Sequence, residues 1–199
     1  MTQIINDDCL NALKDIPNNS IDLIITSPPY LNNWDYGHIT LIELYFLNYA
    51  QSYKDVTIIV RNKLVKSSTY VLQNVPNNPK IIIPFKTIKE KLKQLRDQTF
   101  EIRSKKKSGK KYDVIIISYF NDMYTILREL YRIMKPNSTC NIVVGDSGLY
   151  GIHVPTDLII LEIGENIGFL KEDLVILRRR MATRHKLNLR ESVVSLRKI

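Results

Sequence analysis

The stretch Ile21-Asp22-Leu23-Ile24-Ile25-Thr26-Ser27-Pro28-Pro29-Tyr30 decides the fold of this 199-residue chain. Its first six residues are mostly branched and apolar, which is typical of a strand buried in a parallel sheet. The two prolines that follow cannot donate a hydrogen bond to a neighbouring strand, so they require an extended loop. We therefore predict a strand over residues 21–26 and a stiff loop over residues 27–30 at its carboxyl end.

Strands and helices alternate around this stretch. Apolar residues at helical spacing predict helices over residues 8–16, 40–53, 112–134 and 155–168, and apolar runs predict strands over residues 3–6, 139–144, 173–178 and 192–196. Alternation of this kind is typical of an α/β protein with a mainly parallel sheet. The length of the chain favours a single domain over residues 1–199.

Residues 55–111 interrupt this order. Pro76, Pro79 and Pro84 break up the apolar pattern, and only residues 86–103 keep a weak helical periodicity before a lysine-rich tract. We interpret the segment as an insertion into the fold rather than a part of its core.

Positive charge is concentrated in two segments. The net charge is +9, and residues 80–111 contain 12 Lys or Arg against three acidic residues. Residues 178–198 contain eight Lys or Arg against the single acid Glu191. Such clusters indicate a polyanionic partner, most simply nucleic acid, although a solvated lysine-rich surface would have the same composition.

The composition disfavours several classes of protein. No apolar run is long enough to cross a bilayer, and acidic residues near the N-terminus interrupt any signal peptide, so we expect a cytoplasmic protein with no membrane contact. Cys9 and Cys140 lie far apart and the three histidines are scattered, so we expect no metal site. We interpret both cysteines as reduced, buried packing residues.

The run from Ile5 to Tyr30 resembles the amino-group DNA methyltransferases, which use S-adenosylmethionine to methylate cytosine N4 or adenine N6. Their hallmark is Asp, Asn or Ser, then Pro-Pro, then Tyr, Phe or Trp, at the end of a sheet strand. The loop Ser27-Pro28-Pro29-Tyr30 matches it, and residues 31–36 and 130–136 are similar to the family's continuation. The resemblance implies a partial Rossmann-like methyltransferase fold, mainly parallel, with a C-terminal antiparallel strand.

The resemblance also implies that Ser27, Pro28, Pro29 and Tyr30 are the catalytic residues. An exocyclic amino group is a poor nucleophile because its lone pair conjugates with the ring. The Ser27 hydroxyl and the Pro28 carbonyl would accept its protons and direct the lone pair at the methyl donor. Tyr30 offers a ring on which a flipped-out base can stack.

A cofactor site is implied in the same way. Ser27 and Pro28 would contact S-adenosylmethionine, and Asp8 matches an acidic residue that lies near the cofactor's adenine or ribose in the family. Asp8 serves equally well as the N-cap of a helix. Serine at the first motif position is more typical of cytosine N4 enzymes; adenine N6 is the alternative, and methylation of RNA amino groups is a further one.

The chain lacks the glycine-rich cofactor loop and the first strands of a self-sufficient enzyme of this family. Gly145, Gly148 and Gly151 follow a predicted strand without the family's Asp-Pro-Phe, and we interpret them as turn residues. We expect one subunit of a split methyltransferase, whose partner subunit or second copy supplies the missing loop; an inactive relic is the alternative. The split predicts an exposed sheet edge and exposed apolar surface.

The basic segments are expected to contact double-stranded DNA, and we interpret the insertion over residues 55–111 as a DNA-recognition element. The candidate DNA-binding residues are Lys105, Lys106, Lys107, Lys110, Lys111, Arg179, Arg180 and Arg184. An enzyme of this kind would protect host DNA in a restriction-modification setting. The competing hypothesis is a non-catalytic DNA-binding subunit.

Overall fold

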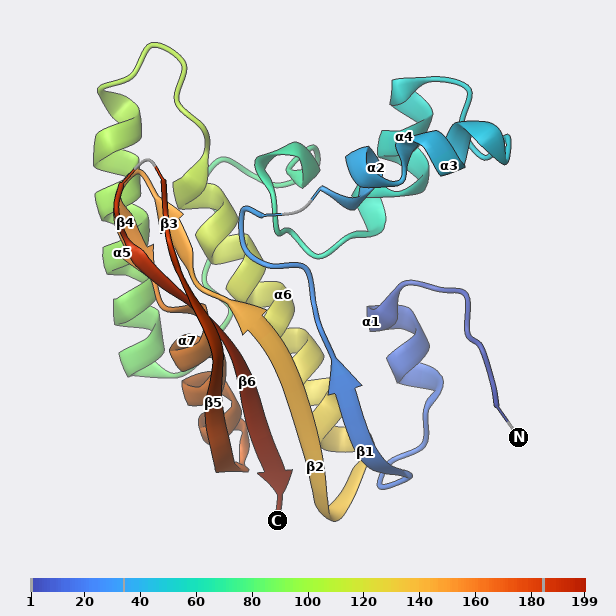
Figure 1. The fold of residues 1–199 in the computed structure, drawn as a ribbon. Coiled ribbons are helices and arrows are strands. Elements are labelled where there is room, and N and C mark those ends of the chain that lie inside the picture. The colour runs from blue at the N-terminus through green and yellow to red at the C-terminus, as the bar shows by residue number, and fades with distance from the viewer. Residues whose placement is uncertain (1, 34, 184) are drawn as a thin grey trace.

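A four-stranded sheet with strand order β1-β2-β6-β5 forms the centre of the computed structural model, which describes residues 2–33, 35–183 and 185–199 (Figure 1). β1 (Ile21–Thr26) pairs in parallel with β2 (Met134–Gly145). β6 (Asn188–Lys198) lies between β2 and β5 (Phe169–Met181) and runs antiparallel to both. Three strands therefore share one direction, and the α/β class with its C-terminal antiparallel strand is confirmed.

Helices cover one face of the sheet. α6 and α7 pack against each other and against strands of the sheet, and α5 packs against both helices. Gly168 caps α7 with a φ of 126°, a conformation that favours glycine. No helix in the part of the chain that the structure describes is long and apolar enough to cross a membrane. The bounds are Lys86–Ser104 for α5, Tyr112–Ile133 for α6 and Thr156–Ile167 for α7.

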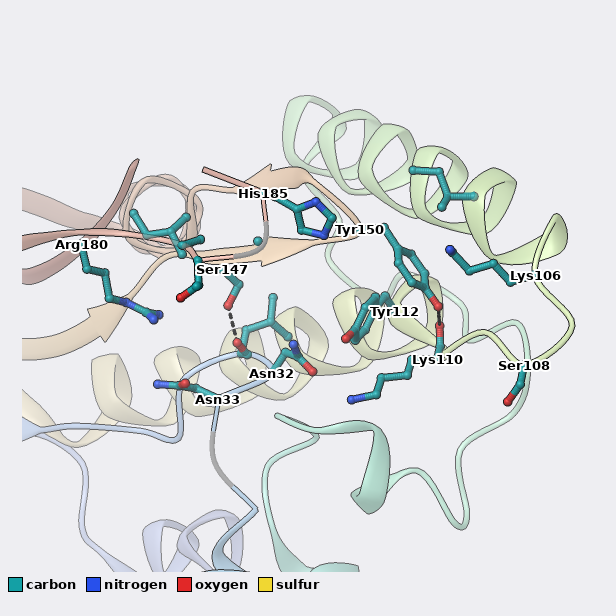
Figure 2. A pocket seen from close by; sticks show the side chains of 16 residues that line it. Asn32, Asn33, Lys106, Ser108, Lys110, Tyr112, Ser147, Tyr150, Arg180 and His185 are labelled. Atoms are coloured by element: carbon teal, nitrogen blue, oxygen red, sulfur yellow. Dashed lines mark hydrogen bonds between the residues drawn. The ribbon is translucent and has the colours of Figure 1, made fainter. Parts of the chain in front are cut away.

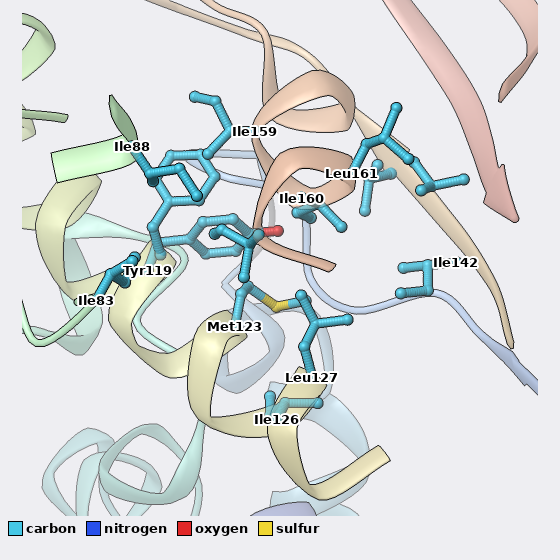
Figure 3. Close-up of a cluster of buried hydrophobic side chains, with 14 of the residues drawn as sticks. Ile83, Ile88, Tyr119, Met123, Ile126, Leu127, Ile142, Ile159, Ile160 and Leu161 are labelled. Atoms are coloured by element: carbon cyan, nitrogen blue, oxygen red, sulfur yellow. The ribbon is translucent and has the colours of Figure 1, made fainter. Parts of the chain in front are cut away.

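The core lies between the helical layer and the sheet. Tyr119, Met123 and Leu127 of α6 belong to one buried cluster with Ile142 of β2 and Ile160 of α7 (Figure 3). None of the five is more than 2% exposed. Burial of each aliphatic side chain in such a cluster contributes roughly 1.5–3 kcal/mol before the cost in conformational entropy.

The position of α5 corrects one expectation. We interpreted residues 55–111 as lying outside the core, but Ile88, Leu92 and Leu95 of α5 are buried in it, as is Ile83 just before the helix. Their helical spacing forms one apolar stripe, which the many lysines of this segment conceal in its composition. The inner side of the insertion is therefore structural.

Short helices precede and follow β1. α1 (Cys9–Ala12) and the adjoining 3-10 turn η1 (Leu13–Asp15) fit the helix predicted over residues 8–16, whereas the strand predicted over residues 3–6 does not form. The helix predicted over residues 40–53 is interrupted where Asn48 adopts a φ of 56°. The following elements are α2 (Tyr36–Ile39), α3 (Leu41–Phe46), α4 (Tyr53–Ile59), η2 (Arg61–Lys63) and η3 (Thr69–Val71).

A buried ion pair holds these short helices together. The Arg61 side chain is 2% exposed and lies 2.8 Å from Asp35, whose side chain is 10% exposed. Arg61 also donates to the hydroxyls of Thr57 and Tyr53. Separating the pair would leave a buried charge without a partner, which lowers the stability of the fold. The pair therefore holds residue 35, shortly after the Pro-Pro loop, against α4 and η2.

β1 is an edge strand, and no other strand of the described residues pairs with its outer side. Leu23 and Ile25 of β1 are 54% and 73% exposed. Ile25 pairs with Asn141 of β2, which points away from its buried neighbours Cys140 and Ile142, so the exposed residues lie on the face opposite the helices. This is the exposed edge and apolar surface that we expected of a partial sheet.

The two cysteines differ in their surroundings. Cys140 of β2 is buried as expected, and burial raises the pKa of its thiol to about 12. Cys9 is exposed, so the interpretation of both cysteines as buried packing residues is wrong for Cys9. Cys9 opens α1 at the surface, where only the backbone is needed for the helix.

Candidate functional site

The loop Ser27-Pro28-Pro29-Tyr30 leaves the sheet at the carboxyl end of β1. Because β1 and β2 are parallel, the end of β2 at Gly145 lies at the same edge of the sheet. Ser27 is exposed, whereas the three residues after it are half-buried. The loop thus presents the Ser27 side chain at the surface on a backbone that two prolines make stiff.

The ring of Tyr30 lies over the end of β2. A Cβ atom at Gly145 would be 2.8 Å from Cδ2 of Tyr30, so the ring occupies space that a side chain there would fill. The Tyr30 hydroxyl donates a 2.7 Å hydrogen bond to Oε1 of Glu191 on β6. Gly145, which we interpreted as a turn residue, instead ends a strand and allows the close approach of the ring.

The charges around Tyr30 keep it a neutral donor. Burial and the hydrogen bond to Glu191 raise the pKa of the Tyr30 hydroxyl. The same hydrogen bond, followed by the neighbouring Arg178, lowers the pKa of the Glu191 carboxyl. Tyr30 is therefore protonated and Glu191 charged at neutral pH, which makes the hydrogen bond between them charge-assisted.

The backbone after Tyr30 is anchored to the rest of the fold. Leu31 is fully buried, and the Ser147 hydroxyl of β3 (Ser147–Leu149) donates to its carbonyl. The Asn33 N–H donates a 3.1 Å hydrogen bond to the Tyr30 carbonyl. The loop is thus fixed on both sides, by β1 before it and by this anchor after it.

A buried polar network supports the end of β2. Asp146 follows Gly145 directly and accepts a 2.8 Å hydrogen bond from His153 of β4 (Ile152–Val154). Arg190 lies between the carboxylates of Asp146 and Asp157, at 3.3 Å and 2.8 Å, and both aspartates are buried. Burial raises the pKa of Asp157. The network joins β2, β4, α7 and β6 beneath the loop.

Asp8, which we expected either to contact the cofactor or to cap a helix, caps a helix in the structure. Its carboxylate accepts a 2.8 Å hydrogen bond from the backbone N–H of Leu10 and is the N-cap of α1. Asp8 lines a small pocket of about 160 Å³ with residues 62–66 and Asp122. Ser27 and Pro28, the other two expected cofactor residues, do not line this pocket.

A basic cleft of about 590 Å³ adjoins the loop (Figure 2). Lys106 and Lys110 from the insertion and Arg180 from β5 line it, so the structure brings together the two basic segments that the sequence separates. Asn32 and Asn33, which follow Tyr30, also line it. No acidic residue is among the described residues that line the cleft, so it favours an anionic ligand.

Among the described residues, Lys105, Lys107, Lys111 and Arg179 do not line the cleft. Lys105 pairs with Glu101 at 2.6 Å on the exposed surface of α5, and Lys111 donates a 2.8 Å hydrogen bond to Asn77. Lys107 and Arg179 are exposed, and Arg179 belongs to β5, which continues beyond the strand predicted over residues 173–178. Arg184 lies outside the residues that the structure describes.

An aromatic pair in the cleft was missed in the sequence. The rings of Tyr112 and Tyr150 have centroids 4.6 Å apart, and Nζ of Lys106 lies 5.4 Å from the Tyr150 ring centroid. Tyr150 sits in the turn after β3, and its hydroxyl donates to the Lys110 carbonyl at 2.9 Å. Aromatic faces among cations suit the bases and phosphates of a nucleic acid. The two tyrosines lie far apart in the chain and carry no local signal, so only the fold reveals the pair.

Comparison with known proteins supports the resemblance found in the sequence. The chain is 28% identical over 203 residues to the Type II methyltransferase M.AvaI of Nostoc sp. and of Anabaena variabilis, covering 98% of this chain and 42% of theirs. It is 28% identical over 191 residues to the Type II methyltransferase M.BsoBI of Geobacillus stearothermophilus, covering 89% of this chain and 37% of that protein. The resemblance to DNA methyltransferases is confirmed, and the chain spans about two-fifths of the length of these curated relatives.

No protein-family model matches the chain. Among solved structures, it is similar to a DNA modification methylase of Thermus thermophilus, with 17% identity, a TM-score of 0.44, and coverage of 96% of this chain and 50% of that one. One structure of that protein is a complex with S-adenosyl-L-methionine.

Proposed function

We propose that this chain is the catalytic part of a site-specific DNA methyltransferase that uses S-adenosylmethionine to methylate the exocyclic amino group of a flipped-out base. The observation that carries the proposal is the Ser27–Tyr30 loop, held at the carboxyl end of β1 beside the basic cleft. The similarity to Type II methyltransferases along nearly the whole chain supports it. Such an enzyme acts on cellular DNA, so we place it in the cytoplasm, in a restriction-modification setting.

The residues of the Ser27–Tyr30 loop have different proposed roles in the reaction. The Ser27 hydroxyl and the Pro28 carbonyl accept hydrogen bonds from the target amino group, which draws its nitrogen toward sp³ geometry and exposes the lone pair. The Tyr30 ring stacks on the flipped-out base and keeps it in the site. We favour cytosine N4 as the target because serine occupies the first motif position; adenine N6 is the alternative.

S-adenosylmethionine supplies an electrophilic methyl group when it is bound, but the residues of this chain form only part of a site for it. Asp8 caps α1 and lines a pocket that Ser27 and Pro28 do not line, and the described residues contain no glycine-rich loop beside Ser27 and Pro28. We propose that a polypeptide supplying this loop lies against the exposed edge of β1.

A second subunit, or a second copy of the chain, is the proposed source of the missing part. The unpaired edge of β1 and the exposed Leu23 and Ile25 supply a surface onto which further strands and helices can pack. The relatives' greater length agrees with a chain that requires more polypeptide to act.

Double-stranded DNA is the proposed substrate, and the cleft is its proposed contact surface. Lys106, Lys110 and Arg180 contact phosphates, which positions the duplex without reading its sequence. The side chains of Asn32 and Asn33 are amides of the kind that hydrogen-bond base edges.

The test is methyl transfer from labelled S-adenosylmethionine to unmethylated DNA, followed by digestion and mass spectrometry of the modified nucleoside. The chain is assayed alone and with the product of the neighbouring gene. N4-methylcytosine in the mixture alone supports the split enzyme, and N6-methyladenine corrects the target base. Activity of the chain alone would refute the need for a different subunit.

The non-catalytic alternative is separated by S27A and Y30A in the same assay. An enzyme loses turnover in both variants while keeping most of its DNA affinity, because the phosphate contacts lie elsewhere. If the chain is instead a non-catalytic DNA-binding subunit, the chemistry takes place on its partner, so neither substitution changes the turnover of the mixture or its affinity for DNA.

A further inference from the structure

Three neighbouring strands form one row of residues next to Tyr30. Gly145 of β2 pairs with Glu191 of β6, and Glu191 pairs with Arg178 of β5. Paired residues of adjacent strands point to the same face of a sheet. The Tyr30 ring lies where Gly145 has no side chain, so the row consists of a ring, a carboxylate and a guanidinium.

The two carboxylate oxygens of Glu191 have separate partners. Oε1 accepts the 2.7 Å hydrogen bond from the Tyr30 hydroxyl, and Oε2 accepts a hydrogen bond from Nε of Arg178. The Glu191 side chain is 17% exposed, whereas that of Arg178 is 67% exposed. Arg178 therefore fixes the carboxylate from the solvent side, and Glu191 in turn fixes the hydroxyl.

Two contacts hold the Tyr30 ring, and the Ser27 side chain interacts with its hydroxyl as well. The backbone at Gly145 lies under the ring, and Glu191 holds the atom at its far end. A tyrosine held only by its own backbone would sample several rotamers and would lose this freedom when a base stacked on it. A ring that is already fixed avoids that loss, and an error of about 1 Å in the position of such a group can cost about a hundredfold in rate.

We propose that Glu191 is a positioning residue for the methyl-transfer reaction, which holds the Tyr30 ring in place to receive the flipped-out base. This inference rests on the proposed function, because it assigns the ring to base stacking. Glu191 does not touch the reacting atoms and acts only through Tyr30.

The first arm of the test does not depend on activity. The Tyr30 resonances of tyrosine-labelled protein are assigned by their loss in Y30F and then recorded in E191A and E191Q. We expect E191A to shift the Tyr30 resonances and E191Q to keep them near wild type, since an amide oxygen still accepts the hydrogen bond. Unchanged Tyr30 resonances in a folded E191A would overturn the proposal.

Glu172 provides a matched control. It lies on the same sheet, accepts a 2.8 Å hydrogen bond from the Thr139 hydroxyl and pairs with Arg197, and so copies the pattern of partners around Glu191. E172A should leave the Tyr30 resonances and the methyl transfer unchanged. A shift of the Tyr30 resonances in E172A equal to that in E191A would mean that any loss of charge from the sheet moves the ring, and would overturn the specific role.

The second arm is a double-mutant cycle in the active assembly. Y30F and E191A should each lower kcat by roughly tenfold, with little change in KM for DNA, because loss of a hydrogen bond to a charged group has about this effect. The double variant should be no slower than the slower single variant, and E191Q should restore most of the rate. Effects that multiply to about a hundredfold would overturn the proposal. A wild-type mixture of the chain and its partner that methylates no DNA would refute the proposed function and leave the first arm to decide the Tyr30–Glu191 contact.

Discussion

The substitution G145A tests whether the Tyr30 ring is seated on the end of β2. The new Cβ would lie 2.8 Å from Cδ2 and 3.1 Å from Cε2 of Tyr30, whereas ordinary contacts begin at 3.4 Å. The ring must therefore retreat by roughly 0.6 Å, which is the difference between the first distance and an ordinary contact. It cannot do so freely, because its hydroxyl is bonded to Glu191 at 2.7 Å.

Two opposing effects determine how G145A changes the free energy of unfolding. Overpacking of this kind costs about 1–3 kcal/mol, and replacing a glycine by alanine at an ordinary φ returns about 0.4–1 kcal/mol by restricting the unfolded chain. We expect G145A to lower the free energy of unfolding by about 1–2 kcal/mol. Methyl transfer should fall more steeply, by about tenfold to a hundredfold, because the displaced ring no longer matches the stacked base.

Urea unfolding and the methyl-transfer assay measure the two effects. G148A is the control, because its Cβ would meet Cδ1 of Leu187 at 2.9 Å, and the end of a leucine side chain can rotate away. The control should change the free energy of unfolding by less than about 0.5 kcal/mol. Wild-type stability and turnover in G145A would show that the ring does not occupy this place.

Three further predictions concern other parts of the molecule. R61M leaves Asp35 buried without its partner and should lower the free energy of unfolding, measured in urea, by about 3–5 kcal/mol. The double variant D35N/R61M should recover most of this loss. A loss below about 1 kcal/mol in R61M would contradict a buried ion pair. Burial raises the pKa of Asp122 above 3.8, so the folded chain binds the carboxyl proton more tightly than the unfolded chain does. The free energy of unfolding therefore falls as the pH rises through the raised pKa. The Tm of D122N should lack this fall, and parallel Tm profiles of wild type and D122N would refute the assignment. Charge reversal of the lysines at 105–107 should weaken DNA binding and flatten its salt dependence, with an unchanged slope in a salt titration as the contrary result.

Local signals account for the parts of the fold that were predicted. The strand over residues 21–26 and the long helix of residues 112–133 carry strong apolar patterns and were found with nearly their observed bounds. The role of α5 in the core was missed because its lysines dominate the composition, although Ile88, Leu92 and Leu95 keep helical spacing. The predicted strand over residues 3–6 fails because no neighbouring strand of the described chain is there to pair with it.

The candidate site could be assembled from the sequence only where its residues are adjacent in the chain. The four residues of the Pro-Pro loop form one motif, so the sequence was enough to find them. The partner of Tyr30 lies 161 residues away, and the carboxylates of Asp146 and Asp157 meet Arg190 only through the sheet and α7. Contacts of this kind depend on strand order and register, which no local pattern specifies.

The edge position of β1 has a consequence for the order in which the chain folds. β1 reaches β2 only after residues 27–133 have been bridged, whereas β5 and β6 follow one another in the chain. Non-local pairings form slowly, although each doubling of a bridging segment adds only about 0.6 kcal/mol of closure entropy. α7 and the β5–β6 hairpin should therefore form early, and β1 should join the sheet last. In the proposed two-part enzyme, a strand that arrives last on an open edge could still pair with a strand of the partner during synthesis, and folding and assembly would then be one process.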